Sequence, residues 1–289
     1  MFATATATAT ATANAVSAKG YIPILPAPAS TRAPASTRAP ASTRPQLRAL
    51  TGSAAQSACD LCRLNTLCLP EGMSAPQRSE YTALIAQHRK LAAGEALYHA
   101  GDPFTHLYLV KTGTFKTVVL SNDGREQITG FRLPGDTLGV DAISYSVHAS
   151  DAIALEEARV CAIPFAQLTR LGQHAAPVQS HIHRLLAQEV VSDQGVMLLL
   201  GRMTAEERVV TFLLNLARRF EARGQSRHAF RLAMTREEIG IYLGLTLETV
   251  SRCFSRMKNS GWLALEGRLV KILDYDALCQ VTGTQQRFH

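Results

Sequence analysis

The chain has 289 residues, 46% of them hydrophobic, which is enough for about two domains with sizeable cores. Residues 1–50 hold five bases and no acid, so the net charge of +7 leaves only +2 elsewhere and does not by itself indicate a nucleic-acid partner. No apolar run reaches the roughly 18 to 20 residues of a membrane span, and the start lacks the basic region of a signal peptide. We therefore expect a cytoplasmic protein without membrane contact.

Residues 1–50 are of low complexity. An alternation of Ala and Thr is followed by three copies of APASTR. Such a segment has too little apolar bulk to offset the entropy of ordering the chain, so we predict a disordered tail.

Three cysteines follow within ten positions, with the spacing C-x2-C-x5-C: Cys59, Cys62 and Cys68. Three thiolates need a fourth ligand to complete a tetrahedral zinc site or to hold an iron–sulfur cluster. Cys161, in a strand-like stretch, is the best candidate, whereas Cys253 and Cys279 fit structural or idle roles. The long gap to Cys161 is unusual for zinc, and a disulfide is disfavoured in a reducing cytosol, so zinc, a disulfide and iron–sulfur all stay open at this point.

From about residue 90 to 165 the pattern changes to short alternating segments separated by turn signals such as SNDG and LPGD. Antiparallel strands at this spacing are typical of a small jelly-roll barrel. We assign residues 51–173 to the cysteine segment and this sensory β-barrel.

Residues 174–203 are predicted as one long helix. Its apolar stripe has spacings of 4, 3, 4 and 3 and consists of Leu186, Val190, Asp193, Met197 and Leu200. The stripe predicts the seam of a two-stranded coiled coil and hence a homodimer, although a buried helix within one chain has the same pattern. Across a two-fold axis Asp193 would face its own copy and weaken association, unless the side chain turns to solvent.

Residues 204–289 predict a winged helix-turn-helix. Thr204, Thr235 and Thr246 are in N-cap positions, and the first two have Glu three residues later. Gly244 lies in the turn between two short helices, and a hairpin around Glu266 and Gly267 supplies the wing.

The second of these helices is predicted to enter the major groove of DNA. Glu248, Ser251 and Arg252 lie near its start, where Arg reads guanine, Glu reads cytosine and Ser joins either. Phosphate contacts are expected from Arg256, Lys258, Arg268 and Lys271. The fold class is thus α+β: a β-barrel, a long dimerisation helix and a C-terminal winged helix-turn-helix.

Four segments together resemble a known family: CDLCRLNTLCLP, EQITGFRLPGD, AEERVVTFLLNLARRF and FRLAMTREEIGIYLGLTLETVSR. They are similar to the cyclic-AMP receptor (CRP/FNR) superfamily, with its cyclic-nucleotide-binding-like barrel, and within it to the FNR-type oxygen-sensing regulators. The resemblance covers about residues 55 to 283. It implies a [4Fe–4S] cluster on Cys59, Cys62, Cys68 and Cys161, which oxygen converts towards [2Fe–2S] with loss of the dimer and release of DNA.

The resemblance also implies roles for individual residues. Asp193 matches the family's dimer-destabilising acid, and Glu248, Ser251 and Arg252 match the E-x-x-S-R signature for half-sites of the TTGAT type. The loop around 123–130 resembles a surface that touches RNA polymerase. The sequence departs from the family at Arg63, where many members have a small polar residue after the second cysteine.

Three other functions are weighed against this one. A cyclic-nucleotide sensor needs a phosphate-binding Arg, but Val140, His148 and Asp151 occupy the corresponding stretch. A zinc-stabilised DNA-binding regulator has the same cysteines. An enzyme is not expected, because the sequence contains no P-loop, no G-x-S-x-G and no H-E-x-x-H.

Overall fold

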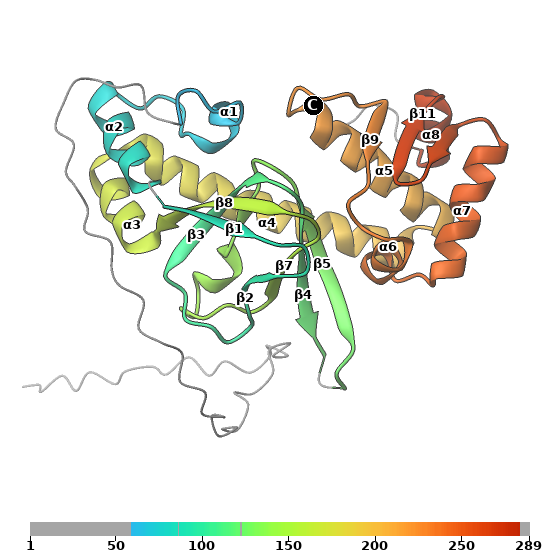
Figure 1. The fold of residues 1–289 in the computed structure, drawn as a ribbon, viewed down its shortest axis with the longest axis horizontal. Helices are drawn as coiled ribbons and strands as arrows, with labels where there is room; N and C mark the ends of the chain where they lie inside the picture. The colour runs from blue at the N-terminus through green and yellow to red at the C-terminus, as the bar shows by residue number, and fades with distance from the viewer. Residues whose placement is uncertain (1–58, 86, 122, 284–289) are drawn as a thin grey trace, which may run out of the picture. The chain divides into compact units, whose positions relative to one another are not determined.

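The computed structural model describes residues 59–85, 87–121 and 123–283, and these lie within one compact unit (Figure 1). The predicted disordered tail, residues 1–50, lies outside the described residues. No helix in the described ranges has the length and apolar character needed to cross a membrane.

Eight strands form two antiparallel four-stranded sheets with the orders β1-β8-β3-β6 and β2-β7-β4-β5. The strands are β1 (Gln87–Leu91), β2 (Ala96–Tyr98), β3 (His106–Thr112), β4 (Phe115–Leu120), β5 (Glu126–Arg132), β6 (Thr137–Leu138), β7 (Asp151–Ala154) and β8 (Ala158–Pro164). Both predicted turn signals connect strands, and Gly124 and Gly135 take positive φ there. This confirms the β-rich sensory fold, although the strand pairings of the described residues do not show a closed barrel.

Helices flank these sheets. Before β1 come α1 (Asn65–Cys68) and α2 (Ala75–Leu84), and a short 3-10 turn, η1 (Val140–Ala142), follows β6. The sequence patterns did not predict α2. Tyr81 is its one buried residue, so its apolar stripe is too thin to give a strong helical period.

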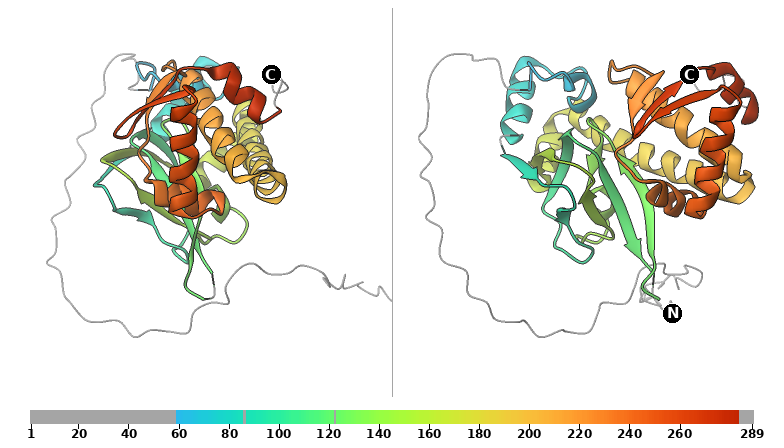
Figure 2. Two further views of the ribbon diagram at one scale, coloured as in Figure 1. Left: turned by 90° about the vertical axis from the view of Figure 1, so that its right-hand side faces the viewer. Right: turned by 45° about the vertical axis from the view of Figure 1, so that its right-hand side comes forward.

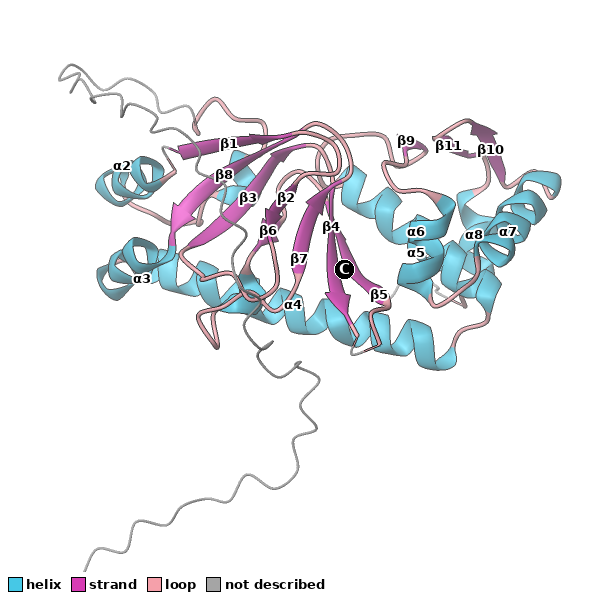
Figure 3. Cartoon of the chain, turned by 60° about the horizontal axis from the view of Figure 1, so that its bottom comes forward, coloured by secondary structure: helices cyan, strands magenta, loops and turns pink. Residues whose placement is uncertain are grey.

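The predicted long helix is present as α4 (Ala176–Arg202), which is continuous over 27 residues. A separate helix that was not predicted, α3 (Phe165–His174), precedes it and ends at Ala175. Pro177 is tolerated in the first turn of α4 because that turn needs no backbone donor. The 27-residue α4 runs alongside the strands towards the C-terminal helices (Figure 3).

The C-terminal part confirms the predicted caps and turn. Its elements are α5 (Ala205–Glu221), β9 (Ala229–Arg231), α6 (Arg236–Leu243), α7 (Leu247–Asn259), β10 (Leu263–Glu266), β11 (Leu269–Ile272) and α8 (Tyr275–Val281). Thr204 and Thr235 form capping boxes with Glu207 and Glu238, and Gly244 ends α6 with φ 63°. The wing has a third strand that was not predicted, β9, which pairs with β11.

One hydrophobic core contains residues of both the sensory sheets and the C-terminal helices. Val118, Ile128 and Phe131 of the sensory sheets and Leu133, directly after β5, belong to the same buried cluster as residues of α5, α6 and α7. Lys116 on β4 also forms an ion pair of 3.0 Å with Glu238 on α6. The predicted division at residues 173 and 203 is therefore crossed by packing, and it stays a prediction.

Candidate cysteine centre and nucleic-acid interface

The cysteine segment is a series of tight turns held in place by α2. The Cys62 amide donates to the Cys59 carbonyl at 3.1 Å, and the Asn65 amide donates to Cys62 at 3.0 Å. At one end Arg78 pairs with Asp60 at 2.8 Å, and at the other the Tyr81 hydroxyl donates to the Cys68 carbonyl at 3.1 Å. Helix α2 therefore orients the segment that carries three of the four predicted thiols.

The fourth thiol comes from the sheet. Cys161 lies on β8, paired with His88 on β1 and with Leu109 on β3. Directly opposite residues in a ladder share a face, so Cys161 lies on the face that packs with Cys59 and Cys68 in one apolar cluster. The structure brings together thiols that are 93 positions apart in sequence, from Cys68 to Cys161.

The four thiols affect one another electrostatically. Burial, followed in order of importance by the neighbouring Cys62, Cys161 and Cys59, raises the pKa of Cys68 to about 12. Burial likewise raises the pKa of Cys161 to about 11, with Lys111 lowering it and Cys59 and Cys62 raising it. Four thiolates in this half-buried place would repel one another unless a cationic centre lay between them.

The donor set therefore fits an iron–sulfur cluster or another thiophilic metal. In the part of the chain that the structure describes, no three His, Cys, Asp or Glu side chains are arranged as a ready metal site, and the cysteines are free thiols. The chemistry and proximity of the four residues support the site, while their role as ligands stays a prediction.

Two cations face the thiols. Burial, Cys62 and Asp60 raise the pKa of Cys59, and Lys111 and then Arg78 offset part of that rise. Lys111 also offsets part of the rise in the pKa of Cys161. Lys111 lies at a bulge of β3, between the pairs Val110–Val160 and Thr112–Arg159. A bulge re-aims the side chain of its extra residue, which accounts for a lysine facing the cysteines. No local sequence pattern distinguishes Lys111 from other strand lysines, and only the bulge does so.

The predicted DNA-reading residues lie on α7. Glu248 and Arg252 are exposed and Ser251 is half-buried, whereas the opposite side of the helix is buried through Val250, Phe254 and other apolar residues. Arg252 Nη2 lies 3.2 Å from Thr249 Oγ1, which holds the guanidinium near the helix start. All three residues are thus available to a groove, and their contacts with DNA stay predictions.

Three of the four predicted phosphate contacts have partners within the chain. Arg256 donates to Glu206 at 2.6 Å, Lys271 to Glu266 at 2.6 Å, and Arg268 to the Ala233 carbonyl at 3.0 Å. Exposed pairs of this kind are weak, so these cations can exchange partners at little cost.

The predicted seam of α4 is uncovered in the single chain. The apolar side chains of the seam are exposed, Val190 to 56% and Met197 to 67%. Asp193 lies among them, and burial and Glu189 raise its pKa while Arg132 lowers it. An exposed apolar stripe of this length is what a second copy would cover.

The stretch that would hold a nucleotide phosphate is occupied by the chain itself. Asp141 Oδ2 accepts from the Ala149 amide at 3.0 Å, the Ser150 amide at 3.1 Å and the Ser150 hydroxyl at 2.9 Å. His148 is buried and stacks on Tyr98 with ring centroids 3.6 Å apart. A carboxylate already takes the donors that an anion would need, which argues against the cyclic-nucleotide alternative.

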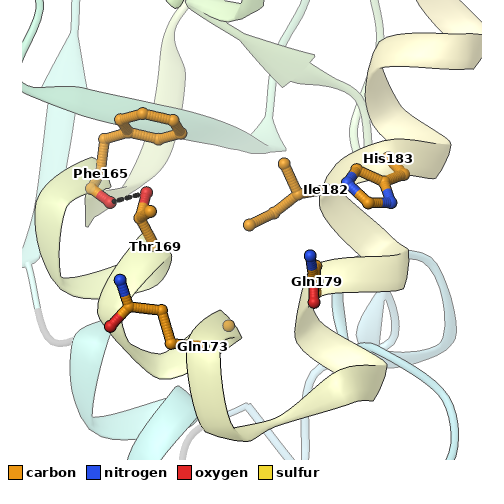
Figure 4. Close-up of a pocket in the computed structure, with 7 residues that line it drawn as sticks. Phe165, Thr169, Gln173, Gln179, Ile182 and His183 are labelled. Atoms are coloured by element: carbon orange, nitrogen blue, oxygen red, sulfur yellow. Dashed lines mark hydrogen bonds between the residues drawn. The ribbon is translucent and has the colours of Figure 1, made fainter. Parts of the chain in front are cut away.

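A separate cavity of about 210 Å³ lies between α3 and α4 (Figure 4). Phe165, Thr169 and Gln173 line one side of it, and Gln179, Ile182 and His183 line the other. It contains none of the predicted site residues. No Asp, Glu, Lys or Arg side chain lines this cavity, so no permanently charged group there would bind a charged ligand.

Comparison with known families defines the class. Residues 88–175 match the family model described as a cyclic nucleotide-binding domain, and residues 207–281 match the one described as a Crp-like helix-turn-helix domain. The chain therefore combines a sensor of the cyclic-nucleotide-binding fold with a DNA-binding helix-turn-helix.

Similar proteins identify the family within this class. The transcriptional activator protein anr of Pseudomonas aeruginosa is 42% identical over 80% of this chain and 94% of its own length. The fumarate and nitrate reduction regulatory protein of Escherichia coli is 40% identical over 82% of this chain and 95% of its own length. The solved structure of FixK2 from Bradyrhizobium japonicum is 34% identical with a TM-score of 0.63, over 68% of this chain and 96% of that one. The chain belongs to the CRP/FNR family of transcriptional regulators, and within it to the FNR type. This confirms the predicted family and the prediction of a regulator rather than an enzyme.

Proposed function

We propose that this chain is a transcriptional activator of anaerobic genes that senses oxygen through a [4Fe–4S] cluster held by Cys59, Cys62, Cys68 and Cys161. The observation that carries the proposal is the convergence of these four thiols from a turn segment and a distant strand. The relatives support it, because their names describe a transcriptional activator and anaerobic regulatory proteins.

When bound, such a cluster supplies a redox-active iron centre that oxygen degrades. The protein's part is to hold four deprotonated thiols at one place. Lys111 and Arg78 offset part of their negative charge, and α2 fixes the segment from Cys59 to Cys68 against the sheet. Ligation would tie this segment to β8 through Cys161.

The proposed output is DNA binding by a cytoplasmic homodimer. Residues 51–173 form the sensor, 174–203 the dimerisation helix and 204–289 the DNA-binding domain. Two copies of α7 separated by about one helical turn of DNA read TTGAT-type half-sites through Glu248, Ser251 and Arg252. Asp193 keeps the dimer weak, so occupancy of the cysteine site decides whether it forms. The β4–β5 hairpin near Asp123 contacts RNA polymerase.

The test is anaerobic reconstitution of the chain and of Cys161→Ser. We expect the unchanged chain to bind iron and sulfide and to bind a TTGAT palindrome, and Cys161→Ser to lose most of its iron and its DNA affinity. Cys279→Ser, a half-buried cysteine outside the cluster, is the matched control and should keep both properties. A colourless, zinc-loaded chain, or a Cys161→Ser variant with unchanged iron and DNA binding, would contradict the proposal.

A further inference from the structure

The turn between β5 and β6, residues 133–136 with the sequence LPGD, contacts the cysteine segment on one side. A Cβ placed on Gly135 would lie 2.7 Å from Leu67 Cδ1, so the Leu67 side chain packs directly over this glycine. Leu67 is in α1, one residue before Cys68. The turn is itself anchored to β3 by the Gly135 amide, which donates to the Val110 carbonyl at 2.8 Å.

The other side of the same turn contacts the DNA-binding domain. Asp136 forms ion pairs with Arg219 and Arg223, both near the end of α5. Arg223 also donates to the Pro134 carbonyl, and Arg219 donates to the Phe131 carbonyl at 2.8 Å. The Arg223 side chain is only 7% exposed. Charge-assisted bonds from two arginines to one carboxylate and to adjacent carbonyls make this a stiff attachment.

The 133–136 turn therefore lies between α1 and the end of α5. Figures 1 and 2 show α1 and the C-terminal end of α5 approaching the same edge of the strands. Electrostatic interactions extend across this edge, from the cysteine segment to the end of α5. Burial lowers the pKa of Arg223, and Asp136 and Cys68 both oppose that shift. The Cys68 thiol therefore lies close enough to the DNA-binding domain for its thiolate form to interact with Arg223.

We propose that the 133–136 turn transmits occupancy of the cysteine site to the DNA-binding helices inside one subunit, independently of the dimer seam on α4. A movement of the cysteine segment changes the contact of Leu67 with the turn, and a movement of the turn changes the ion pairs of Asp136 with the end of α5. The proposal rests on the proposed function, since it assigns a transmission path from the same site.

The physical reason lies in the size of α1. A four-residue helix has almost no stability of its own, so its position depends on what holds its ends. With Cys68 ligated, Leu67 is fixed over Gly135. Without ligation, the segment loses the bonds through its cysteines and keeps the contacts of Asp60 and Tyr81 and its apolar packing. Leu67 is then held less firmly over Gly135, and the turn with its two arginines is less constrained. Sites coupled through such contacts usually differ by about 5- to 150-fold in affinity.

The experiment compares the DNA affinity of cluster-loaded and cluster-free protein, as a ratio, in the full-length chain. The variants are Leu67→Ala and Asp136→Asn. The matched controls are Leu61→Ala, a 73% exposed leucine of the same segment, and Lys116→Met, which removes an ion pair to α6 away from the cysteines. Iron and sulfide per chain and the monomer–dimer constant are measured on every sample.

We expect both variants to keep their iron content and dimer constant, while the loaded-to-free affinity ratio falls towards one. Both controls should keep the ratio of the unchanged chain. Hydrogen exchange gives a second readout: amides at the end of α5 should become more protected on cluster loading in the unchanged chain but not in Leu67→Ala.

The proposal is wrong if Leu67→Ala and Asp136→Asn keep the full ratio, or if the ratio falls only in step with iron content or dimerisation. Failure of the proposed function has a different signature, because the unchanged chain would then bind no iron. If Asp136→Asn does not fold, Leu67→Ala decides the question.

Discussion

Arg132 on β5 and Glu189 on α4 form a two-pronged ion pair. Arg132 Nη1 donates to Glu189 Oε2 at 2.8 Å, and Nη2 donates to Oε1. Glu189 is one helical turn before Asp193, so the pair fixes α4 to the sensory sheet beside the proposed dimer switch. The same arginine lowers the pKa of Asp193 while Glu189 raises it. This pair therefore sets both the position and the electrostatic environment of Asp193.

We predict that Arg132→Met lowers the free energy of unfolding by about 2 kcal/mol, because it leaves the Glu189 carboxylate half-buried without its partner. Arg125→Met is the control, since Arg125 is 84% exposed in its pair with Asp123 and its loss should cost less than about 0.5 kcal/mol. Urea unfolding of both variants measures the difference, and equal losses would show that the Arg132 pair has no special role.

A second prediction concerns the pH dependence of dimerisation. The Asp193 carboxyl has a raised pKa and would gain a further like charge from the second copy, so the dimer binds more protons than the monomers. Association should therefore strengthen as the pH falls towards the raised pKa of Asp193, which lies above the usual carboxyl value of 3.8. Arg132 and Glu189 are the charged groups that face Asp193 within the chain, and the copied Asp193 faces it across the seam.

Asp193→Asn removes this charge and should tighten the dimer by up to roughly 5-fold at neutral pH, the scale of solvent-screened charge pairs. Its dimer constant should also lose most of its dependence on pH. Sedimentation equilibrium of both chains checks this, and an unchanged constant would mean that Asp193 points away from the partner.

DNA reading gives a third prediction. Arg252→Ala should weaken binding to a TTGAT palindrome by about 1 to 3 kcal/mol per half-site and relax the preference at one base pair of each half-site. Lys258→Ala, on the same helix, should weaken all DNA sequences alike and reduce the salt slope by about two, one for each subunit. Fluorescence titrations against the palindrome and single-base variants distinguish the two. If Arg252→Ala weakens binding to all DNA sequences equally, Arg252 contacts phosphates rather than a base.

The turn of the helix-turn-helix can be tested at a single glycine. A Cβ on Gly240 would lie 2.6 Å from the Leu245 carbonyl oxygen, a backbone atom that cannot move aside cheaply. Gly240→Ala should therefore destabilise the fold by about 2 kcal/mol or more, although Ala is the better helix former. Gly195→Ala in α4, with nothing within 4 Å, should be neutral or up to about 1 kcal/mol stabilising. Thermal unfolding of both variants provides the comparison.

Asp141 gives a prediction about acid stability. Burial alone would raise its pKa, but His148 and the bonds from Ser150 and Ala149 outweigh burial and lower it. A lowered carboxyl pKa adds stability above the usual value, and that stability is lost as the pH falls through the lowered pKa. Asp141→Asn should thus cost about 1 to 3 kcal/mol at neutral pH and less below about pH 4. A loss that is the same at all pH values would contradict this account.

Sequence alone determined the features that depend on neighbours along the chain. The caps at Thr204, Thr235 and Thr246, the turn at Gly244 and the hairpin wing are all local, because caps and turns use bonds over three or four residues. Thin or short elements were missed for the same reason: α2 buries a single residue and β9 has three residues.

Tertiary structure decided which distant residues meet. That Cys161 faces the Cys59–Cys68 segment was a hypothesis from residue type, and only the register of β8 with β1 and β3 places it there. The bulge that turns Lys111 towards the thiols, the Arg132–Glu189 pair and the packing of Leu67 over Gly135 have no local signal. Contacts of this kind depend on how whole sheets and helices pack, since a side chain's partner across a sheet is set by strand register rather than by sequence distance.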